Sequence, residues 1–136
     1  ILALNDKKIP IYGTGKNIRD WIFVEDHCDA IMDVLLNGKS GESYNISAGN
    51  EIDNITIIKK ILTIIGKPLE NIEFVEDRPG HDFRYSMEST KIRNNLGWSQ
   101  NKKIEEGLKK TIEWYLENKE WWMHLDQKIL DATPWK

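Results

Sequence analysis

The stretch of the sequence with the greatest capacity for chemistry is DRPGHDFRY, residues 77–85. It places Arg78 and His81 on either side of Pro79-Gly80, a dipeptide typical of tight turns. Arginine donates paired hydrogen bonds to phosphate oxygens, and glycine lets a backbone approach a ligand closely. The composition favours an anion-binding loop. The alternative is a solvated surface turn in which His81 caps a neighbouring carbonyl.

Arg19 is a second candidate ligand for an anion, because a guanidinium fork matches phosphate geometry in a way that an ammonium cannot. Taken alone, it is explained equally well by a surface ion pair with Asp20 or Glu25. The functional interpretation requires Arg78 to converge on the same point. Two arginines could then offset the two charges of a nucleotide pyrophosphate.

Asn54 and Tyr12 each have an ordinary and a functional interpretation. Asn54 stands where a helix is expected to begin, and a helix N-terminus favours anions through its free N–H groups and its dipole. Its ordinary role is to cap that helix or to neighbour the cap. Tyr12 either packs in the core or offers a ring face to a flat base.

The remaining reactive residue types give no pattern for catalysis or metal binding. The single cysteine, Cys28, falls on the apolar stripe of an expected helix, so we expect an inert core residue. The three histidines are scattered without metal-ligand spacing, and no carboxylate pair compels an acid and base assignment. GTGKN, residues 13–17, lacks both the Walker and the dinucleotide spacing. The residues therefore support binding better than catalysis.

Length and charge restrict the function classes. The 136 residues have the size of one domain, and the formal net charge of −3 argues against bulk electrostatic binding to nucleic acid or to an anionic membrane. No apolar run is long enough to cross a bilayer and no secretory signal is visible, so we expect a cytosolic protein. The chain begins with Ile1 rather than methionine, which suggests the tail of a longer protein.

The elements that must position these residues alternate between strands and helices, which indicates a mixed α/β domain. Alternating or β-branched patterns predict four extended segments, at residues 8–13, 20–24, 43–47 and 72–76. The last of these leads directly into DRPGHDFRY. The loop is therefore expected at the end of a strand.

Four helices are predicted from apolar spacing and from terminating glycine or proline residues. The first, residues 25–38, is expected to bury Cys28, Ile31, Met32, Leu35 and Leu36. The second begins at Asp53 or Asn54 and buries Ile58, Ile61, Leu62 and Ile65. A short helix begins at Ser89 or Thr90 and ends before Gly97, and a last helix over residues 102–118 buries Ile104, Leu108, Ile112, Tyr115 and Leu116. A tryptophan-rich tail follows to Lys136.

The order of motifs resembles the C-terminal portion of the dTDP-glucose 4,6-dehydratases, in the extended short-chain dehydrogenase superfamily. The matching stretches are PIYGTGKNIRDWIFVEDHCDAI, GESYNISAGNEIDN, FVEDRPGHDFRY, LGW and TIEWYLENKEWW, which together span nearly the whole chain. RDWIFVEDHCDAI is shared in outline by other enzymes that act on nucleotide sugars. DRPGHD is the sharper mark, because it separates these dehydratases from the related sugar epimerases.

The resemblance implies a small mixed α/β substrate-binding lobe over residues 1–136 that closes over a dTDP-sugar held against a Rossmann domain. The lobe itself would lack that Rossmann domain. Residues of the chain that match family contacts with the substrate fall into three groups. Pro10, Ile11 and Tyr12 would line the nucleotide end of the substrate. Arg19 would contact the diphosphate, and Asn54 would match another substrate contact of the family. The second wall would consist of Asp77, Arg78, Pro79, Gly80 and His81, with Arg78 opposite Arg19.

The resemblance also implies a reaction whose catalytic groups lie in preceding sequence. In the family, bound NAD takes hydride from sugar C4, water is eliminated across C5 and C6, and hydride returns to C6. The dinucleotide fingerprint, the acidic catalytic group and the tyrosine-lysine pair are absent here in the expected form. We therefore expect no catalytic, NAD-binding or metal-binding residue in this chain, which alone would be inactive. The parent enzyme is expected to be a cytoplasmic homodimer that serves sugar-nucleotide biosynthesis, including that of dTDP-rhamnose.

Two alternatives stay open at this point. The first is the corresponding lobe of a nucleotide-sugar epimerase, against which DRPGHD speaks. The second is a nucleotide-sugar binding module without catalysis. The roles of Arg84 and Tyr85 are also open, since either residue could support the loop or touch the ligand.

Overall fold

A computed structural model describes residues 1–125 of the chain, and it confirms the mixed α/β class. Short strands alternate with longer helices, as the sequence predicts. In chain order the elements are η1 (Ala3–Asn5), β1 (Ile9–Tyr12), β2 (Ile18–Asp20), α1 (Val24–Asn37), β3 (Glu51–Asp53), α2 (Asn54–Ile65), η2 (Leu69–Asn71), β4 (Ile72–Val75), α3 (Thr90–Leu96), α4 (Ile104–Glu117) and α5 (Lys119–Trp122).

The strands form two small sheets of different types. β1 and β4 pair in parallel with Tyr12 opposite Val75, and β2 and β3 pair antiparallel with Arg19 opposite Ile52. Because β1 and β4 are parallel, the loops that follow them leave from the same edge. The predicted binding loop therefore begins beside the Gly13–Gly15 turn.

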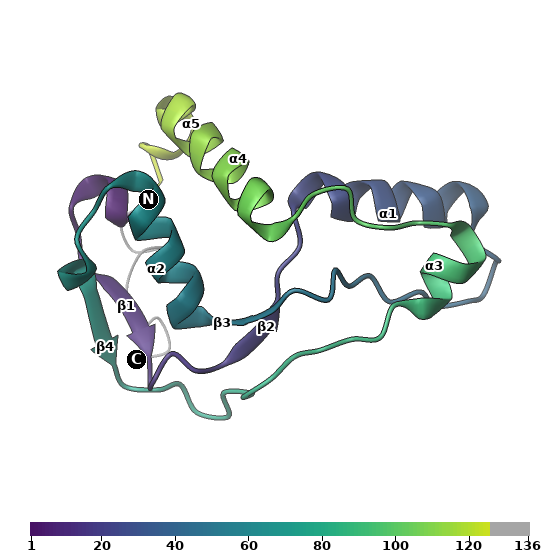
Figure 1. Ribbon diagram of the computed structural model, residues 1–136, viewed down its shortest axis with the longest axis horizontal. Coiled ribbons are helices and arrows are strands. Elements are labelled where there is room, and N and C mark those ends of the chain that lie inside the picture. The colour runs from purple at the N-terminus through teal and green to yellow at the C-terminus, as the bar shows by residue number, and fades with distance from the viewer. Residues whose placement is uncertain (126–136) are drawn as a thin grey trace.

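The elements gather into two groups joined by β2 and β3 (Figure 1). β1, β4 and α2 lie together at one end, where Ile57 and Leu62 of α2 are fully enclosed. α1 and α3 lie at the other end, around a cluster of Ala30, Ile92 and Trp98. α4 and α5 lie to one side of the strands.

α2 has the predicted boundaries because a capping residue stands at each end. Asp53 is the N-cap, and its Oδ1 accepts a hydrogen bond of 2.7 Å from the backbone N–H of Thr56. Gly66 closes the helix in the left-handed conformation at φ 67°. The capping role expected of Asp53 or Asn54 therefore belongs to Asp53, and Asn54 is the first helical residue.

α1 also has the predicted extent, but the prediction of its buried face is wrong. The exposed fractions of Ile31, Met32, Leu35 and Leu36 are 49, 50, 73 and 71%, and Cys28 is exposed as well. The residues that α1 buries are Asp26 and Ala30. α3 and residues 98–102 cover the side of α1 that carries Asp26 and Ala30, and the described part of the chain leaves the apolar stripe exposed.

Two strand predictions and one burial prediction are also wrong. The strand expected at 20–24 is shifted, since β2 ends at Asp20 and α1 begins at Val24. Residues 43–47 form no strand, because no strand of the described chain pairs with them. Leu116 of α4 is 41% exposed rather than buried.

The tryptophan-rich tail noted in the sequence extends beyond the described residues. Among the described helices, none has the length and apolar character that crossing a membrane requires.

Candidate functional site

The candidate site begins where Gly13 meets Asp77. The backbone N–H of Gly13 donates a 3.0 Å hydrogen bond to the carbonyl of Val75, which extends the β1–β4 pairing by one residue. A Cβ atom at Gly13 would lie 2.7 Å from Oδ2 of Asp77, and the φ of Gly13 is +56°. Glycine is required here on both counts, because the turn is left-handed and the carboxylate occupies the side-chain space.

Asp77 organises the Pro79-Gly80 turn. Its Oδ1 accepts a 2.9 Å hydrogen bond from the N–H of Arg78 and lies 2.6 Å from Nδ1 of His81. The hydrogen bond from His81 is the main cause that lowers the pKa of Asp77. The carboxylate therefore holds both flanks of the turn, and Arg78 is left on an exposed part of the loop.

The same loop contacts β1 through an aromatic pair. The rings of Tyr12 and His81 meet edge to face, with centroids 6.3 Å apart and an interplanar angle of 81°. Tyr12 and Pro10 are half-buried, so part of each faces outward, whereas Ile11 is 2% exposed and packs in the core. The structure thus brings Tyr12 and the turn together and encloses the side chain of Ile11.

Arg19 has a different set of partners from the ion pair that sequence alone allowed. Its Nη1 donates to the carbonyl of Ile18 at 2.7 Å and its Nη2 to the carbonyl of Asp82 at 3.0 Å. Its guanidinium carbon lies 4.6 Å from the ring centroid of Tyr85. Asp20 instead accepts hydrogen bonds from the residues 47, 49 and 50. Arg19 is therefore attached to the loop rather than neutralised by a carboxylate of the described chain.

Both arginines influence the hydroxyl of Tyr85. The phenol of Tyr85 donates a hydrogen bond to Asp82, and this bond is the main cause that raises the pKa of Tyr85. The positive charges of Arg19 and Arg78 both act against that rise. Arg19 is bonded to Asp82, four residues after Arg78, so Arg19 is attached to the loop that carries Arg78, and the convergence of the two arginines on one anion stays a prediction.

Asn17 connects the loop to the start of α2, and sequence reasoning did not identify it. Its side chain donates to the carbonyl of Asp82 at 3.2 Å, and its own carbonyl accepts from the N–H of Asn54 at 3.1 Å. Asn17 is 6% exposed, so a polar residue is buried at the junction of the two elements. The only signal in the sequence was its place at the end of a glycine turn, two residues before Arg19. Through Asn17, Asn54 is tied to the loop.

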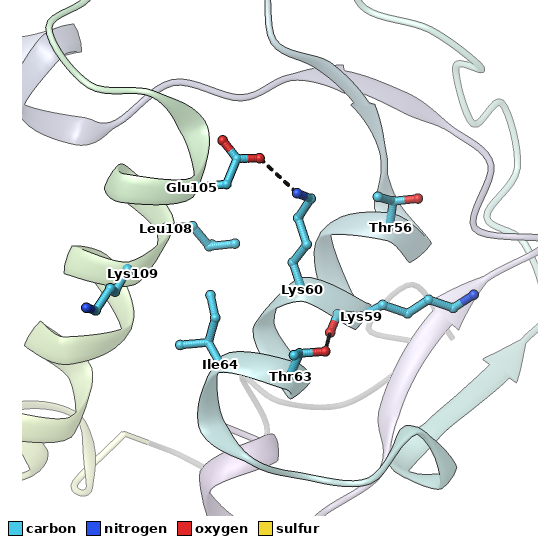
Figure 2. A pocket seen from close by; sticks show the side chains of 8 residues that line it. All are labelled: Thr56, Lys59, Lys60, Thr63, Ile64, Glu105, Leu108 and Lys109. Carbon is cyan, nitrogen blue, oxygen red and sulfur yellow. Dashed lines mark hydrogen bonds and ion pairs between the residues drawn. The ribbon is translucent and has the colours of Figure 1, made fainter.

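A hollow of about 450 Å³ between α2 and α4 is separate from this site (Figure 2). Lys60 reaches across it to Glu105 with an N–O distance of 2.9 Å, and Ile64 and Leu108 face one another beside this ion pair. The other residues that line it are Thr56, Lys59, Thr63 and Lys109. None of the residues predicted to bind substrate is among them.

The described residues contain no cluster of three or more His, Cys, Asp or Glu side chains arranged to hold a metal ion. The Gly13–Gly15 turn leads from β1 into β2 and not into a helix. A dinucleotide phosphate loop needs a following helix N-terminus to supply N–H groups. GTGKN therefore does not fit the phosphates of NAD.

Comparisons with known proteins agree with these features. A curated dTDP-glucose 4,6-dehydratase of Escherichia coli is 44% identical over 142 residues, covering 96% of this chain and 38% of the relative. The crystal structure of dTDP-glucose 4,6-dehydratase from Bacillus anthracis in complex with NAD is 45% identical with a TM-score of 0.86, covering 92% of this chain and 40% of that one. A UDP-glucose 4-epimerase of Thermotoga maritima, solved with UDP-glucose, is 28% identical with a TM-score of 0.79, covering 85% and 37%.

These comparisons confirm the resemblance to the dTDP-glucose 4,6-dehydratases and the fold of an extended short-chain dehydrogenase. The chain spans about two fifths of the length of the relatives that it matches. A family model described as GDP-mannose 4,6 dehydratase matches residues 1–111, and the chain therefore belongs to the GDP-mannose 4,6 dehydratase family.

Proposed function

We propose that residues 1–136 form the substrate-binding C-terminal domain of an NAD-dependent dTDP-glucose 4,6-dehydratase. The observation that carries the proposal is that Arg19 donates a 3.0 Å hydrogen bond to the carbonyl of Asp82, in the loop that also carries the exposed Arg78. Two guanidinium groups at one edge match the two charged phosphates of a nucleotide sugar. The parent enzyme would convert dTDP-glucose to dTDP-4-keto-6-deoxyglucose.

Each site residue has a role in this proposal that follows from its position. Tyr12 and Pro10 offer half-buried apolar surface to the nucleotide, while Ile11 is enclosed and contributes through its backbone. Arg19 and Arg78 bind the diphosphate from two sides.

Asn54 lies at the start of α2, where the N–H groups of Asn54, Ile55 and Thr56 already donate to Asn17, Gly15 and Asp53. Its role in this proposal is therefore a contact through its side-chain amide. The residues Asp77, Pro79, Gly80 and His81 shape the wall that carries Arg78.

NAD would be held by the part of the enzyme that precedes this chain, since the described residues offer no dinucleotide loop. When bound there, NAD supplies the hydride acceptor and donor for the oxidation and reduction of the sugar. This chain contributes the remainder: it binds the diphosphate, fixes the sugar's position, and closes one side of the site. Such positioning is itself a large part of enzymatic rate enhancement.

The exposed stripe of α1 marks where that preceding part would pack. Its residues Ile31, Met32, Leu35 and Leu36 are 49–73% exposed, and an apolar face of this kind is normally covered. Residues 43–47 lie in the same half of the chain and have no strand partner among the described residues. We assign the NAD-binding domain as the occupant, because the relatives carry about three fifths of their length outside the matched region. The parent enzyme is proposed to be a cytoplasmic homodimer that supplies dTDP-rhamnose synthesis.

The experiment that tests the proposal uses the full-length protein that contains this chain, incubated with NAD and dTDP-glucose. A dehydratase yields a 4-keto-6-deoxy sugar nucleotide that has lost one water, which mass spectrometry detects. A product of unchanged mass and altered stereochemistry would instead support the epimerase alternative, which the structural likeness to the Thermotoga maritima epimerase favours. Binding of dTDP-glucose without turnover would support the alternative of a non-catalytic nucleotide-sugar binding module. Parallel reactions with UDP-glucose measure the base specificity.

A further inference from the structure

Residues 82–86, here called the brace, follow the DRPGH turn and run alongside β2. Ile18 donates its N–H to the carbonyl of Phe83 at 2.8 Å and accepts from the N–H of Tyr85 at 3.1 Å. Ile18 and Arg84 thereby form a parallel bridge. Successive side chains of an extended segment point to opposite faces, so Arg84 and Tyr85 lie on opposite faces of β2.

On one face, Arg84 fastens the brace to β3. Its Nε and Nη2 donate to the two carboxylate oxygens of Glu51 at 2.7 and 2.8 Å, and Ser86 donates to the same carboxylate at 2.6 Å. A bidentate arginine–carboxylate pair fixes orientation as well as distance. The brace is thus held in register by a side-chain clamp and by its backbone.

On the other face, the brace holds Arg19. The ring of Tyr85 lies 4.6 Å from the guanidinium carbon, and the carbonyl of Asp82 accepts from Nη2 at 3.0 Å. The carbonyl of Asp82 is itself fixed by the side chain of Asn17, and the Tyr85 hydroxyl donates to the carboxylate of Asp82. Together with the bond from Nη1 to the carbonyl of Ile18, these contacts use one face of the Arg19 guanidinium and two of its five N–H donors.

We propose that Tyr85 is a positioning residue, which aims the guanidinium of Arg19 at the diphosphate of a nucleotide sugar. This inference rests on the proposed function and extends it, because Tyr85 acts through Arg19 without touching the ligand. A free arginine side chain loses about 2 kcal/mol of rotamer freedom when it is fixed. Stacking on Tyr85 removes part of that cost before the ligand arrives, so the ligand binds more tightly.

The test is a double-mutant cycle in the full-length protein, with dTDP binding measured by calorimetric titration. Tyr85→Leu is expected to weaken dTDP binding about 3- to 30-fold, the range of a partly desolvated cation–π contact. Arg19→Ala is expected to weaken it by at least as much. The double variant is expected to bind no more weakly than Arg19→Ala alone, because Tyr85 has no effect once its arginine is gone.

A conservative variant separates positioning from general support of the fold. Tyr85→Phe keeps the ring and loses only the hydroxyl, so its dTDP affinity should stay within about 3-fold of the wild type. If Tyr85→Leu does not fold, Glu51→Gln provides the same cycle by loosening the brace from its other face. It should weaken dTDP binding in the wild-type background and have no further effect in Arg19→Ala.

The outcomes distinguish this inference from the proposed function. Unchanged dTDP affinity in Arg19→Ala overturns the proposed diphosphate contact itself. Weakened affinity in Arg19→Ala, together with unchanged affinity in Tyr85→Leu, overturns only the positioning role. Losses that multiply in the double variant also overturn it, since they would show that Tyr85 acts on the ligand independently.

Discussion

The imidazole Nδ1 of His81 lies 2.6 Å from Oδ1 of Asp77, across the Pro79-Gly80 turn. The two residues that begin and end DRPGH therefore hold one another, and the Gly13 turn leaves no room for Asp77 to move towards β1. Their side chains shape the loop, whereas Arg78 between them stands exposed. Within the described turn, Arg78 is thus the side chain best placed to meet a ligand.

Replacing Arg78 with alanine is expected to weaken dTDP binding to the full-length protein about 10- to 150-fold. The physical reason is the loss of a charge-assisted hydrogen bond of about 1.5–3 kcal/mol. The melting temperature should change little, because Arg78 is exposed. Calorimetric titration with dTDP measures the effect. Lys109→Ala is the matched control, since it removes one positive charge from α4 at a site 67% exposed and paired with Glu113. Equal losses in both variants would show that net charge alone is responsible.

Gly13→Ala is expected to reduce both dTDP affinity and stability. The new Cβ would lie 2.7 Å from Oδ2 of Asp77, so the carboxylate that holds the turn must shift. Gly41→Ala is the control, because Gly41 has a φ of +80° but no atom within 4 Å of its Cβ position. It carries the backbone strain without the clash. Thermal melts should show a loss of stability in both variants that is larger for Gly13→Ala, and dTDP titration should show lost affinity for Gly13→Ala alone. Retained affinity in Gly13→Ala would contradict the assigned contact.

The clamp between Glu51 and Arg84 should make stability depend on acid pH. The hydrogen bonds from Arg84 and then from Ser86 lower the pKa of Glu51 from 4.5 to about 2. A lowered folded-state pKa adds stability that is fully present above pH 4.5 and is lost as pH falls towards 2. Melting curves of wild type and Glu51→Gln from pH 7 to pH 2 measure this. The difference in Tm should be constant above about pH 5 and shrink below it. A difference that grows on acidification would refute the pairing.

Asp26 should be one of the costliest polar residues to remove. It is 2% exposed, and its two oxygens each accept a 3.0 Å hydrogen bond, from the N–H groups of Asn101 and Lys102. Asp26→Ala leaves both donors unpaired next to the start of α4, at a cost of about 2–4 kcal/mol in unfolding free energy. Asp26→Asn keeps one acceptor and should lose about half as much. Urea denaturation of the full-length protein compares them, and equal losses would be the contrary result.

Leu35→Ser on α1 should affect the stability of the full-length protein much more than that of residues 1–136 alone. In residues 1–136 expressed alone, Leu35 is 73% exposed, so the change should leave stability within about 0.5 kcal/mol and reduce self-association. In the full-length protein the same change should destabilise by about 2–4 kcal/mol, because the NAD-binding domain is proposed to cover this face. Light scattering and denaturant titration provide the two measurements. A silent substitution in the full-length protein would place the domain interface elsewhere.

The sequence predicts the helices of this fold well, because their ends carry local signals. Asp53 and Gly66 mark the limits of α2 by capping chemistry that requires no distant partner. The predictions that are wrong are those that depend on which other element packs against or pairs with a segment. Residues 43–47 have the composition of a strand, yet a strand exists only where a neighbour accepts its hydrogen bonds. Leu35 has the periodicity of a buried face, yet burial needs another surface to cover it.

For the candidate site, the candidate ligand-binding residues could be predicted from the sequence, but the residues that hold them in place could not. The chemistry of Arg78 and the turn dipeptide could be recognised from the sequence alone. Asn17 could not, since its importance comes from contacts with Asp82 and Asn54, which lie 65 residues and 37 residues away along the chain. The partner of Arg84 likewise lies on β3, which no local pattern relates to the loop.

The parallel pairing of β1 with β4 also sets when the site can form. Ile9 of the first strand meets Ile72 of the second, and α1, β3 and α2 all lie in the intervening chain. Closing so long a stretch costs entropy that only non-local contacts repay, and parallel pairs are slow to nucleate for this reason. During synthesis, the Gly13 turn must therefore await Asp77 until most of this domain has left the ribosome. The candidate site consequently forms late in folding, and a chain that ends before β4 lacks one wall of it.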